Sequence, residues 1–355
     1  SSSGDRDCFT DALIREIDYR KNEITDDIST LYIGGGTPSL MPDDNLKRIL
    51  DALRDSFAGR FRPAETTMEV NPGDVTEERS RFWKSAGIDR ISMGGQSFVD
   101  SELKFLWRRH TSDQAADAFS ILRQAGFHNM SLDLIYGIPG QTAESFRFSL
   151  DRIISLRPEH ISVYSLMYEE NTPLTKLRER GVVKETDEDT SIKMYQALLH
   201  DLKSAGYRHY EISNFALPGF ESRHNSSYWT GIPYIGFGPG AHSYDGEYIR
   251  RGNPPDIKRY ISYFSDSDSL TPFYIEETLN LTELFEEYLL TRMRTQDGID
   301  LSDFILRFGR ESYTRLMRNA SPYLKNGILL CDAGRLFLSE QGFLISDKVI
   351  FDLVV

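Results

Sequence analysis

The first two-thirds of the sequence repeat one pattern, a short β-rich segment followed by an amphipathic helix. Strands are predicted at 30–36, 66–72, 90–98, 129–139 and 160–169, and apolar residues recur at helical spacing in the segments between them. Gly87 and Gly126 follow two of these helical segments, where helices commonly end. A long helix at 187–205 and a further strand at 209–216 continue the series. This alternation predicts an α/β fold with a parallel sheet, either doubly wound or closed as a barrel.

The rest of the chain has a different character. Residues 217–275 are rich in Gly, Pro, Tyr and Ser and show little periodicity, which is typical of a connecting segment. A helical pattern resumes near Thr278, two shorter helical segments follow, and residues 328–343 read as a small β-hairpin. Three helices and a hairpin resemble a winged helix. We therefore predict a barrel-like or doubly wound part at 1–216, a connecting segment at 217–275 and a small C-terminal α+β domain at 276–355.

Charge and cysteine content narrow the classes of function. A net charge of −13 argues against a general affinity for nucleic acid or anionic membrane surfaces, so a DNA-binding role for the winged-helix-like part is disfavoured. No apolar run approaches the length of a transmembrane segment. Cys8 and Cys331 are the only cysteines, too few and too far apart for a disulfide framework or a metal-ligand cluster. We expect a cytoplasmic protein.

Polar or glycine-rich residues lie on or just after each predicted strand. Because the carboxyl ends of parallel strands meet on one face, these residues predict a binding site there. Helix capping is the simpler explanation for Asn71, but Glu69 and Asp133 lie inside otherwise apolar strands and would need partners if buried. The candidates are the turn Gly34, Gly35, Gly36 and Thr37, together with Glu69, Gln96, Asp133, Tyr136, Tyr164 and Met167.

Two further candidates lie outside the strands. Arg108 begins a basic Arg-Arg-His cluster, which alone is more often a solvated surface, but it could pair with a ligand carboxylate if it lies over the strand ends. His224 is followed by Tyr228 and Trp229 in a segment that we expect to be loop-like. A lone histidine is more often structural, but imidazole beside large aromatic rings also suits a planar ligand or a haem iron. His242 is its nearest competitor.

The longer motifs resemble a known family. The stretches YIGGGTPS, EVNPGD, GGQSF with RRH, SLDLIYGIPGQT, HISVYSLMYEENTPL and HNSSYWTGIPYIGFGPGAHSY are similar to the radical S-adenosylmethionine (SAM) family of oxygen-independent coproporphyrinogen III oxidase-like proteins, over roughly residues 8 to 340. The resemblance implies an incomplete (β/α)6 barrel with a small C-terminal domain. The His-Asn-x-x-Tyr-Trp motif resembles the haem chaperone (HemW-type) branch of the family more than the coproporphyrinogen III dehydrogenase, which is the alternative.

The resemblance also assigns roles. Gly35, Gly36 and Thr37 would lie against the amino and carboxylate end of SAM, and Glu69 would hold its polar groups. Gln96, Arg108, Asp133 and Met167 match further binding positions, some of which touch a second SAM in the dehydrogenase. His224 would be an axial haem ligand. The partners implied are haem and haem-acceptor proteins, with a homodimer left open and no nucleic acid.

One departure from the family pattern concerns its iron–sulfur cluster. The family's first strand is followed by Cys-x-x-x-Cys-x-x-Cys, which ligates a [4Fe–4S] cluster, and this motif is absent from the sequence. Two distant cysteines cannot replace three thiolates. We expect the motif to lie upstream of Ser1, and residues 1–355 alone to be inert in radical generation.

Overall fold

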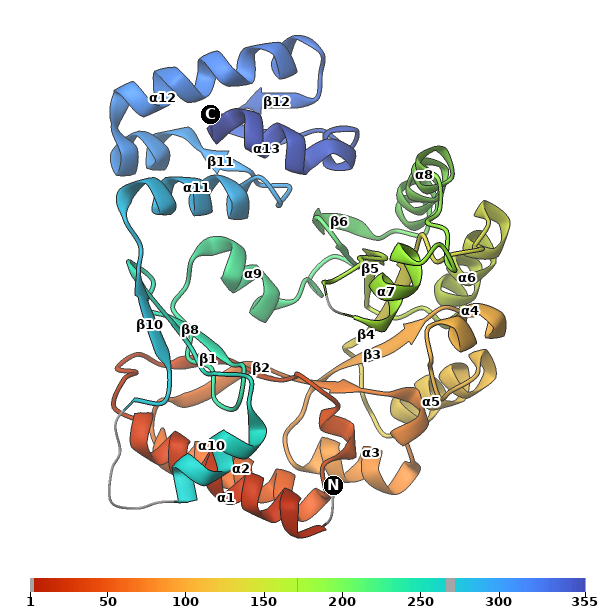
Figure 1. Ribbon diagram of the computed structural model, residues 1–355, viewed down its shortest axis with the longest axis vertical. Coiled ribbons are helices and arrows are strands. Elements are labelled where there is room, and N and C mark those ends of the chain that lie inside the picture. Colours follow the sequence, from red (N-terminus) through yellow and green to blue (C-terminus); the bar gives the residue numbers. More distant parts are fainter. Residues whose placement is uncertain (1–2, 171, 266–271, 355) are drawn as a thin grey trace.

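A seven-stranded sheet forms the centre of the computed structural model, which describes residues 3–170, 172–265 and 272–354 (Figure 1). The strand order is β1-β2-β3-β4-β5-β7-β6, and each neighbouring pair from β1 to β5 is parallel. The bounds are β1 (Ile28–Ile33), β2 (Phe61–Val70), β3 (Arg90–Gln96), β4 (Met130–Tyr136), β5 (His160–Ser165), β6 (Arg208–Glu211) and β7 (Asn214–Ala216). The predicted parallel sheet is confirmed, and it curls into an incomplete barrel.

Helices between the strands cover the outer face of this sheet (Figure 1). Their starts are set by local chemistry: Thr111 and Thr142 each form a capping box, and Thr76 caps the helix that follows it. The buried side chains of these helices, with Trp83 fully enclosed, pack on the sheet in one large hydrophobic core. The helices are α2 (Asp43–Ser56), α3 (Glu77–Ser85), α4 (Asp100–Phe105), α5 (Ser112–Gln124), α6 (Ala143–Leu156), α7 (Pro173–Glu179) and α8 (Glu188–Ser204), with short 3-10 turns η1 (Pro38–Leu40) and η2 (Pro72–Asp74).

The single strand predicted at 209–216 is wrong in detail. The segment is a tight hairpin, in which β6 and β7 pair antiparallel with Glu211 opposite Asn214. β7 inserts between β5 and β6, so the sheet contains one antiparallel strand. Ile212 turns away from the ladder, and its carbonyl lies 3.3 Å from Nε2 of His209. One strand of eight residues and a tight hairpin of two short strands both place alternate side chains on one face. The alternation in the sequence therefore does not distinguish them.

The segment predicted to be loop-like has regular structure. It contains α9 (Arg223–Thr230), β8 (His242–Tyr244), β9 (Ile249–Gly252) and α10 (Ile257–Ser265), and β10 (Ile275–Thr278) completes a small antiparallel sheet in the order β10-β9-β8. His224 therefore lies in the first turn of a helix, not in a loop. The helix starts because the side chain of Ser222 accepts a hydrogen bond from the backbone N–H of Asn225, and it ends at Gly231 in the left-handed conformation.

The C-terminal part has the helix and hairpin order expected of a winged helix. It comprises α11 (Leu281–Arg292), β11 (Ile299–Asp300), α12 (Leu301–Lys325), β12 (Leu329–Asp332), β13 (Arg335–Leu338), η3 (Gly342–Ile345) and α13 (Ser346–Val354). Gly309, with a φ of +82°, breaks α12 into two helices. Figure 1 shows this part stacked beside the open sheet, with α11 nearest to α9.

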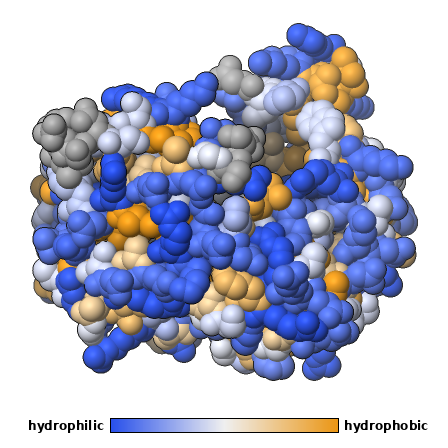
Figure 2. All heavy atoms as spheres, turned by 90° about the horizontal axis from the view of Figure 1, so that it is seen from below, coloured by the Kyte–Doolittle hydropathy of each residue, from blue (hydrophilic) through white to orange (hydrophobic). Residues whose placement is uncertain are grey.

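The outer surface of the barrel part is polar over the face that Figure 2 shows. Around α1 (Ser3–Arg20), α2 and α10 this face is mainly hydrophilic, with apolar areas scattered between polar side chains. In the described ranges no helix is both long enough and apolar enough to cross a bilayer.

A buried carboxylate on α1 fixes the segment after α9 to the barrel. Glu16 is fully buried and accepts hydrogen bonds from Arg20 Nη1 (3.1 Å), Gly238 N (2.7 Å), Asn253 Nδ2 (2.7 Å) and Tyr260 Oη (2.5 Å). A buried charge is tolerated only when such partners satisfy it. Glu16 thus joins α1, α10 and the loops around β8 and β9.

We predict that Glu16→Ala lowers the free energy of unfolding by about 3–5 kcal/mol, because it leaves the buried donors Gly238 N–H and Tyr260 Oη without an acceptor, while Arg20 keeps its ion pair with Glu23. Urea unfolding followed by circular dichroism measures the change. Asp18→Ala, on the same helix but largely exposed, is the control and should change stability by less than about 0.5 kcal/mol. Equal effects of the two substitutions would show that Glu16 does not hold these segments together.

Candidate functional site

The three glycines after β1 are required for different reasons. A Cβ on Gly34 would lie 2.5 Å from the ring of Tyr32 and 2.8 Å from Oε1 of Glu69, so only glycine fits there. Gly35 and Gly36 have φ values of +79° and +64°, a conformation that favours glycine, and nothing lies within 4 Å of where their Cβ atoms would be. The turn therefore presents bare backbone toward open space, which suits the close approach of a ligand.

Glu69 holds this turn in place. Its side chain reaches from β2 to β1, accepting a hydrogen bond from Tyr32 Oη at 2.8 Å and one from the backbone N–H of Gly35 at 3.2 Å. Burial, followed by the charge of Glu69 and the hydrogen bond to it, raises the pKa of Tyr32, so the hydroxyl stays protonated and donates. Glu69 and the glycine turn form one unit, as the sequence pattern predicted for neighbouring strand ends.

Asp133 lies deeper on β4, beside β5. Burial raises the pKa of its carboxyl to about 6; the hydrogen bond from Ser162 lowers it, and Glu69 raises it further. Its Oδ1 atom is buried and has no partner among the residues that the structure describes. A buried acceptor without a partner is costly, so this atom marks a place where a hydrogen-bond donor of a ligand would be stabilised.

The remaining predicted strand-end residues differ in burial. Gln96 ends β3 with a φ of +67°, a strained conformation for this residue type, and is largely buried. A Cβ on Gly94 would lie 2.8 Å from Gln96 Nε2, so Gly94 leaves room for this side chain. Arg108 is exposed, and desolvation lowers its pKa while the charge of Asp133 raises it, which places the two side chains within electrostatic reach. Met167 is exposed beyond β5, with 67% of its surface accessible.

His224 is packed against this group of residues. Its Nδ1 atom lies 2.9 Å from Thr30 Oγ1 and its Nε2 atom 3.0 Å from Tyr228 Oη. The ring stacks on Tyr32 with a centroid distance of 4.8 Å, and Tyr32 in turn bonds to Glu69. Sequence reasoning placed His224 outside the strands of the SAM site; the structure places it in direct contact with the first of them.

Burial favours the neutral form of His224. Burial lowers its pKa, the negative charge of Glu65 raises it, and the positive charge of Arg90 lowers it. Burial also raises the pKa of Tyr228 to about 12, so its hydroxyl stays protonated beside Nε2. Trp229 approaches Glu211 rather than His224. Of the two aromatic residues in the motif, only Tyr228 therefore contacts the imidazole.

Glu65 was missed by the sequence analysis and is central to the site. It is buried on β2 and accepts hydrogen bonds from the backbone N–H groups of Arg223 (3.0 Å) and His224 (3.1 Å) and from Ser222 Oγ (3.3 Å). A carboxylate at a helix N-terminus also interacts favourably with the helix dipole. Its position in the segment FRPAETTMEV, four residues before Glu69, could have suggested a second inward carboxylate.

Arg90 was also missed. It is 2% exposed at the start of β3, its Nε atom has no partner among the described residues, and no ion pair involves it there. Its charge acts on Tyr32, Asp133 and His224. An arginine inside a curled sheet balances the carboxylates around it, which explains how several acidic groups share this interior.

Comparisons with known proteins agree with this geometry. An open barrel with a glycine turn and polar strand ends is the arrangement of the radical SAM superfamily, whose pattern matches residues 8–153, and the HemN C-terminal domain matches residues 279–345. The fold is similar to that of the coproporphyrinogen III oxidase HemN from Escherichia coli, a radical SAM enzyme, with a TM-score of 0.81 at 21% identity over 99% of this chain and 83% of that one.

Relatives with higher identity carry a more specific name. The chain is 34% identical to the heme chaperone HemW of Lactococcus lactis over 97% of this chain and 88% of the relative, and 32% identical to that of Bacillus subtilis over 91% and 84%. The chain belongs to the HemW heme chaperone family, within the radical SAM superfamily.

Membership in the superfamily implies SAM and a [4Fe–4S] cluster, and the residues fit these two groups differently. The bare glycine turn, Glu69 and the unpartnered Asp133 offer the donors, acceptors and space that SAM needs. The cluster has no such ligand set here. Cys8 and Cys331 are both exposed, and among the described residues no three His, Cys, Asp or Glu side chains come together as metal ligands.

The raised pKa of Asp133 predicts a pH-dependent stability. Because the folded-state pKa of about 6 lies above the unfolded value of about 3.9, this group lowers the free energy of unfolding progressively as pH rises from about 4 to about 6. Asp133→Asn should therefore be more stable than the wild type at pH 7 by up to about 3 kcal/mol. The difference should shrink as the pH falls and vanish below about pH 3.

Urea unfolding of ligand-free protein at several pH values measures this difference. Asp151→Asn, an exposed position on α6, is the control and should leave the pH profile unchanged. A difference between Asp133→Asn and wild type that is the same at every pH would mean that Asp133 does not titrate in this range.

The Glu69 contacts predict a role in SAM binding. Glu69→Gln removes the charge that faces the glycine turn, and we expect SAM binding to cluster-loaded full-length protein, with the expected cysteine motif, to weaken by about 1.5–3 kcal/mol or more, the usual contribution of a charged hydrogen bond. Calorimetric titration gives the affinity. Tyr32→Phe keeps the carboxylate and should cost less. Unchanged affinity of the Gln variant would remove Glu69 from the site.

Proposed function

We propose that the protein is a haem-binding chaperone that delivers haem to acceptor proteins in the cytoplasm, and that His224 is an axial ligand of the haem iron. The relatives named above are heme chaperones. The observation that supports the ligand role is the arrangement around the imidazole of His224, which is anchored on one side and reachable on the other.

The anchored side is Nδ1. In the tautomer that we propose, Nδ1–H donates to Thr30 Oγ1, 2.9 Å away, and the lone pair of Nε2 faces the hydroxyl of Tyr228. Ligating histidines commonly use their second nitrogen in this way, because it fixes the ring orientation. The lowered pKa of His224 favours the neutral imidazole that iron requires.

The reachable side is Nε2. Its single partner among the described residues is the hydroxyl of Tyr228, whose side chain is 41% exposed. Rotation of this tyrosine away from the ring would leave Nε2 open to the iron. The released phenol ring would then be free to pack against the porphyrin.

SAM would bind next to this position. Gly35, Gly36 and Thr37 would offer backbone groups to its amino acid end, and Glu69 would accept from its amino group. Gln96, Arg108, Asp133 and Met167 are the further contacts that we propose. Because Tyr32 touches both Glu69 and His224, a ligand at either position changes the surroundings of the other.

The alternative function is an oxygen-independent coproporphyrinogen III dehydrogenase, to whose fold this one is similar. Turnover of coproporphyrinogen by full-length, cluster-loaded protein under anaerobic conditions separates the two functions, since only the enzyme forms protoporphyrinogen. We expect haem binding without turnover.

We predict that His224→Ala shifts or abolishes the Soret band of bound haem and leaves the far-ultraviolet circular dichroism intact. Tyr228→Phe, which removes the competing hydroxyl and keeps the ring, should retain the wild-type spectrum and bind haem as tightly or more tightly.

His242→Ala is the matched control, because His242 is exposed on β8 and belongs to no contact described for the site. Loss of the haem spectrum in the His242 variant, with a normal spectrum in the His224 variant, would reassign the ligand. A normal spectrum in both would make the motif structural.

A further inference from the structure

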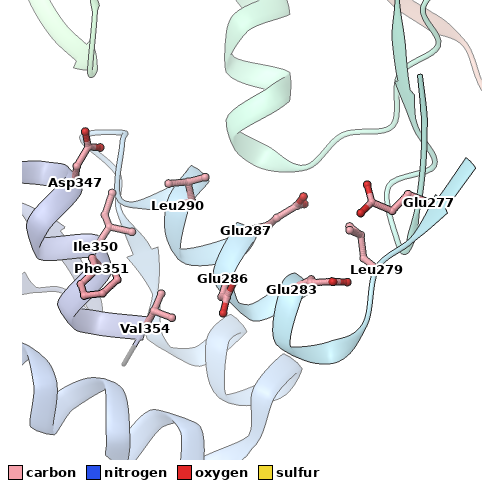
Figure 3. A pocket seen from close by; sticks show the side chains of 10 residues that line it. All are labelled: Glu277, Leu279, Glu283, Glu286, Glu287, Leu290, Asp347, Ile350, Phe351 and Val354. Carbon is pink, nitrogen blue, oxygen red and sulfur yellow. The ribbon is translucent and has the colours of Figure 1, made fainter. Parts of the chain in front are cut away.

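A groove of about 560 Å³ lies between α11, α13 and the end of β10, on the side of the C-terminal part that faces β10 (Figure 3). Ten side chains line it, and they are of two kinds. Five are apolar and five are carboxylates, and the lining contains no Lys, Arg or His. The apolar ones are Leu279, Leu290, Ile350, Phe351 and Val354; the acidic ones are Glu277, Glu283, Glu286, Glu287 and Asp347.

The apolar side chains are not all covered. Leu279 and Ile350 are buried at 6% and 4% exposure, whereas Phe351 is 67% exposed and Leu290 40%. A phenylalanine with two-thirds of its surface in water, next to an exposed leucine and a preformed hollow, is the kind of patch that marks an interaction site. Figure 3 shows Leu290 on α11 and Ile350 and Phe351 on the facing α13, with Leu279 on the segment that joins β10 to α11.

The carboxylates are only partly neutralised. Glu287 pairs with Arg250 at 2.6 Å and Asp347 with Arg294 at 2.8 Å, while Glu283 accepts a capping hydrogen bond from the backbone N–H of Asn280. Glu277 and Glu286 are exposed, and neither has an ion pair within the described ranges. The groove therefore has an unbalanced negative rim around an apolar floor.

We propose that this groove docks a basic amphipathic segment of a partner protein, with apolar side chains placed on Phe351 and Leu290 and Lys or Arg side chains facing Glu277 and Glu286. Charge selects this occupant over the others. A second copy of this chain, with a net charge of −13, and an anionic lipid surface would both be repelled by the rim. Helix-in-groove recognition combines such apolar anchors with complementary charge at the edge.

The groove is connected to the position of His224, which gives the partner a role that rests on the proposed function. Glu287 binds Arg250, and Arg250 Nη1 donates to Tyr234 Oη at 3.3 Å. The ring of Tyr234 packs edge-on against that of Tyr228 at 4.7 Å, and Tyr228 bonds to His224. This series of contacts connects the groove to the proposed haem ligand, so we infer, on the basis of the proposed function, that the partner is the haem acceptor.

A synthetic peptide of Leu and Lys, of about four helical turns with Leu at helical spacing, probes the groove directly. Fluorescence anisotropy of the labelled peptide measures its affinity for the full chain. We expect Glu286→Lys and Phe351→Ser each to weaken binding by about tenfold or more, and added salt to weaken binding to the wild type. Glu311→Lys, an exposed acidic residue on α12 outside the groove, should leave the affinity unchanged.

Three further probes test the assignment of the occupant. A matched Leu/Glu peptide and vesicles of phosphatidylglycerol should not bind, and sedimentation should show no self-association that Phe351→Ser abolishes. Equal affinity of the Leu/Lys peptide for wild type, Glu286→Lys and Phe351→Ser would overturn the proposal. Binding of the vesicles through Phe351, or self-association through it, would overturn it as well.

Haem binding separates failure of this inference from failure of the proposed function. Glu286→Lys and Phe351→Ser should keep the wild-type Soret band, because neither residue touches His224. If these variants bind haem and also still bind the peptide, the docking surface is wrong while the chaperone function stands. If the wild type binds the peptide but no haem, the groove stands and its partner is not a haem acceptor.

Discussion

A buried carboxylate at the start of a short helix determines where the proposed haem ligand lies. Glu65 on β2 receives the first backbone N–H groups of α9 and the hydroxyl of Ser222, so an eight-residue helix that could not persist alone is held against the barrel. A buried, unpaired carboxylate would cost several kcal/mol, and the unsatisfied N–H groups of a helix start are its natural partners. The hydrogen bonds between them satisfy both the buried carboxylate and the N–H groups of the helix start. This contact directs His224 toward Thr30 and Tyr32.

A few contacts connect the proposed SAM position to the proposed haem position. Glu69 holds the glycine turn on one side, and Tyr32 links it to the imidazole of His224 on the other. From His224 a second series of contacts runs through Tyr228, Tyr234 and Arg250 to the C-terminal part. SAM, haem and a docked acceptor would therefore occupy neighbouring positions on one connected framework. This arrangement suits a protein that must bind haem and then release it to a partner.

The sequence predicted the elements whose signals are local. The parallel sheet, the helix at 187–205 and the winged-helix order of the C-terminal part follow from periodicity, capping and turn residues, and the structure confirms them. The hairpin at 208–216 was predicted as one strand because side chains alternate in the same way in one strand and in a tight hairpin. The first turn of α9 was read as loop although Ser222 caps it locally, because its other partner, Glu65, lies more than 150 residues away in sequence. Glycine-rich segments can be helical when tertiary contacts supply what local propensity does not.

The sequence predicted those site residues whose signals are local and missed those that depend on distant contacts. Glu69 and Asp133 stand out as carboxylates on apolar strands, whereas the stacking of His224 on Tyr32 depends on the path of the whole chain between them. The family implies three cysteine ligands for the cluster. Residues 1–355 contain two cysteines, Cys8 and Cys331, and therefore do not supply that ligand set.

The central claim is that α9, fixed by Glu65, presents Nε2 of His224 to haem iron. A crystal structure of the haem-loaded protein tests it most directly. The account predicts iron within bonding distance of His224 Nε2, with Nδ1 still hydrogen-bonded to Thr30 and the ring of Tyr228 turned away from the imidazole. Iron bound to another residue, or haem seated away from α9 with the contact between His224 and Tyr228 intact, would contradict it.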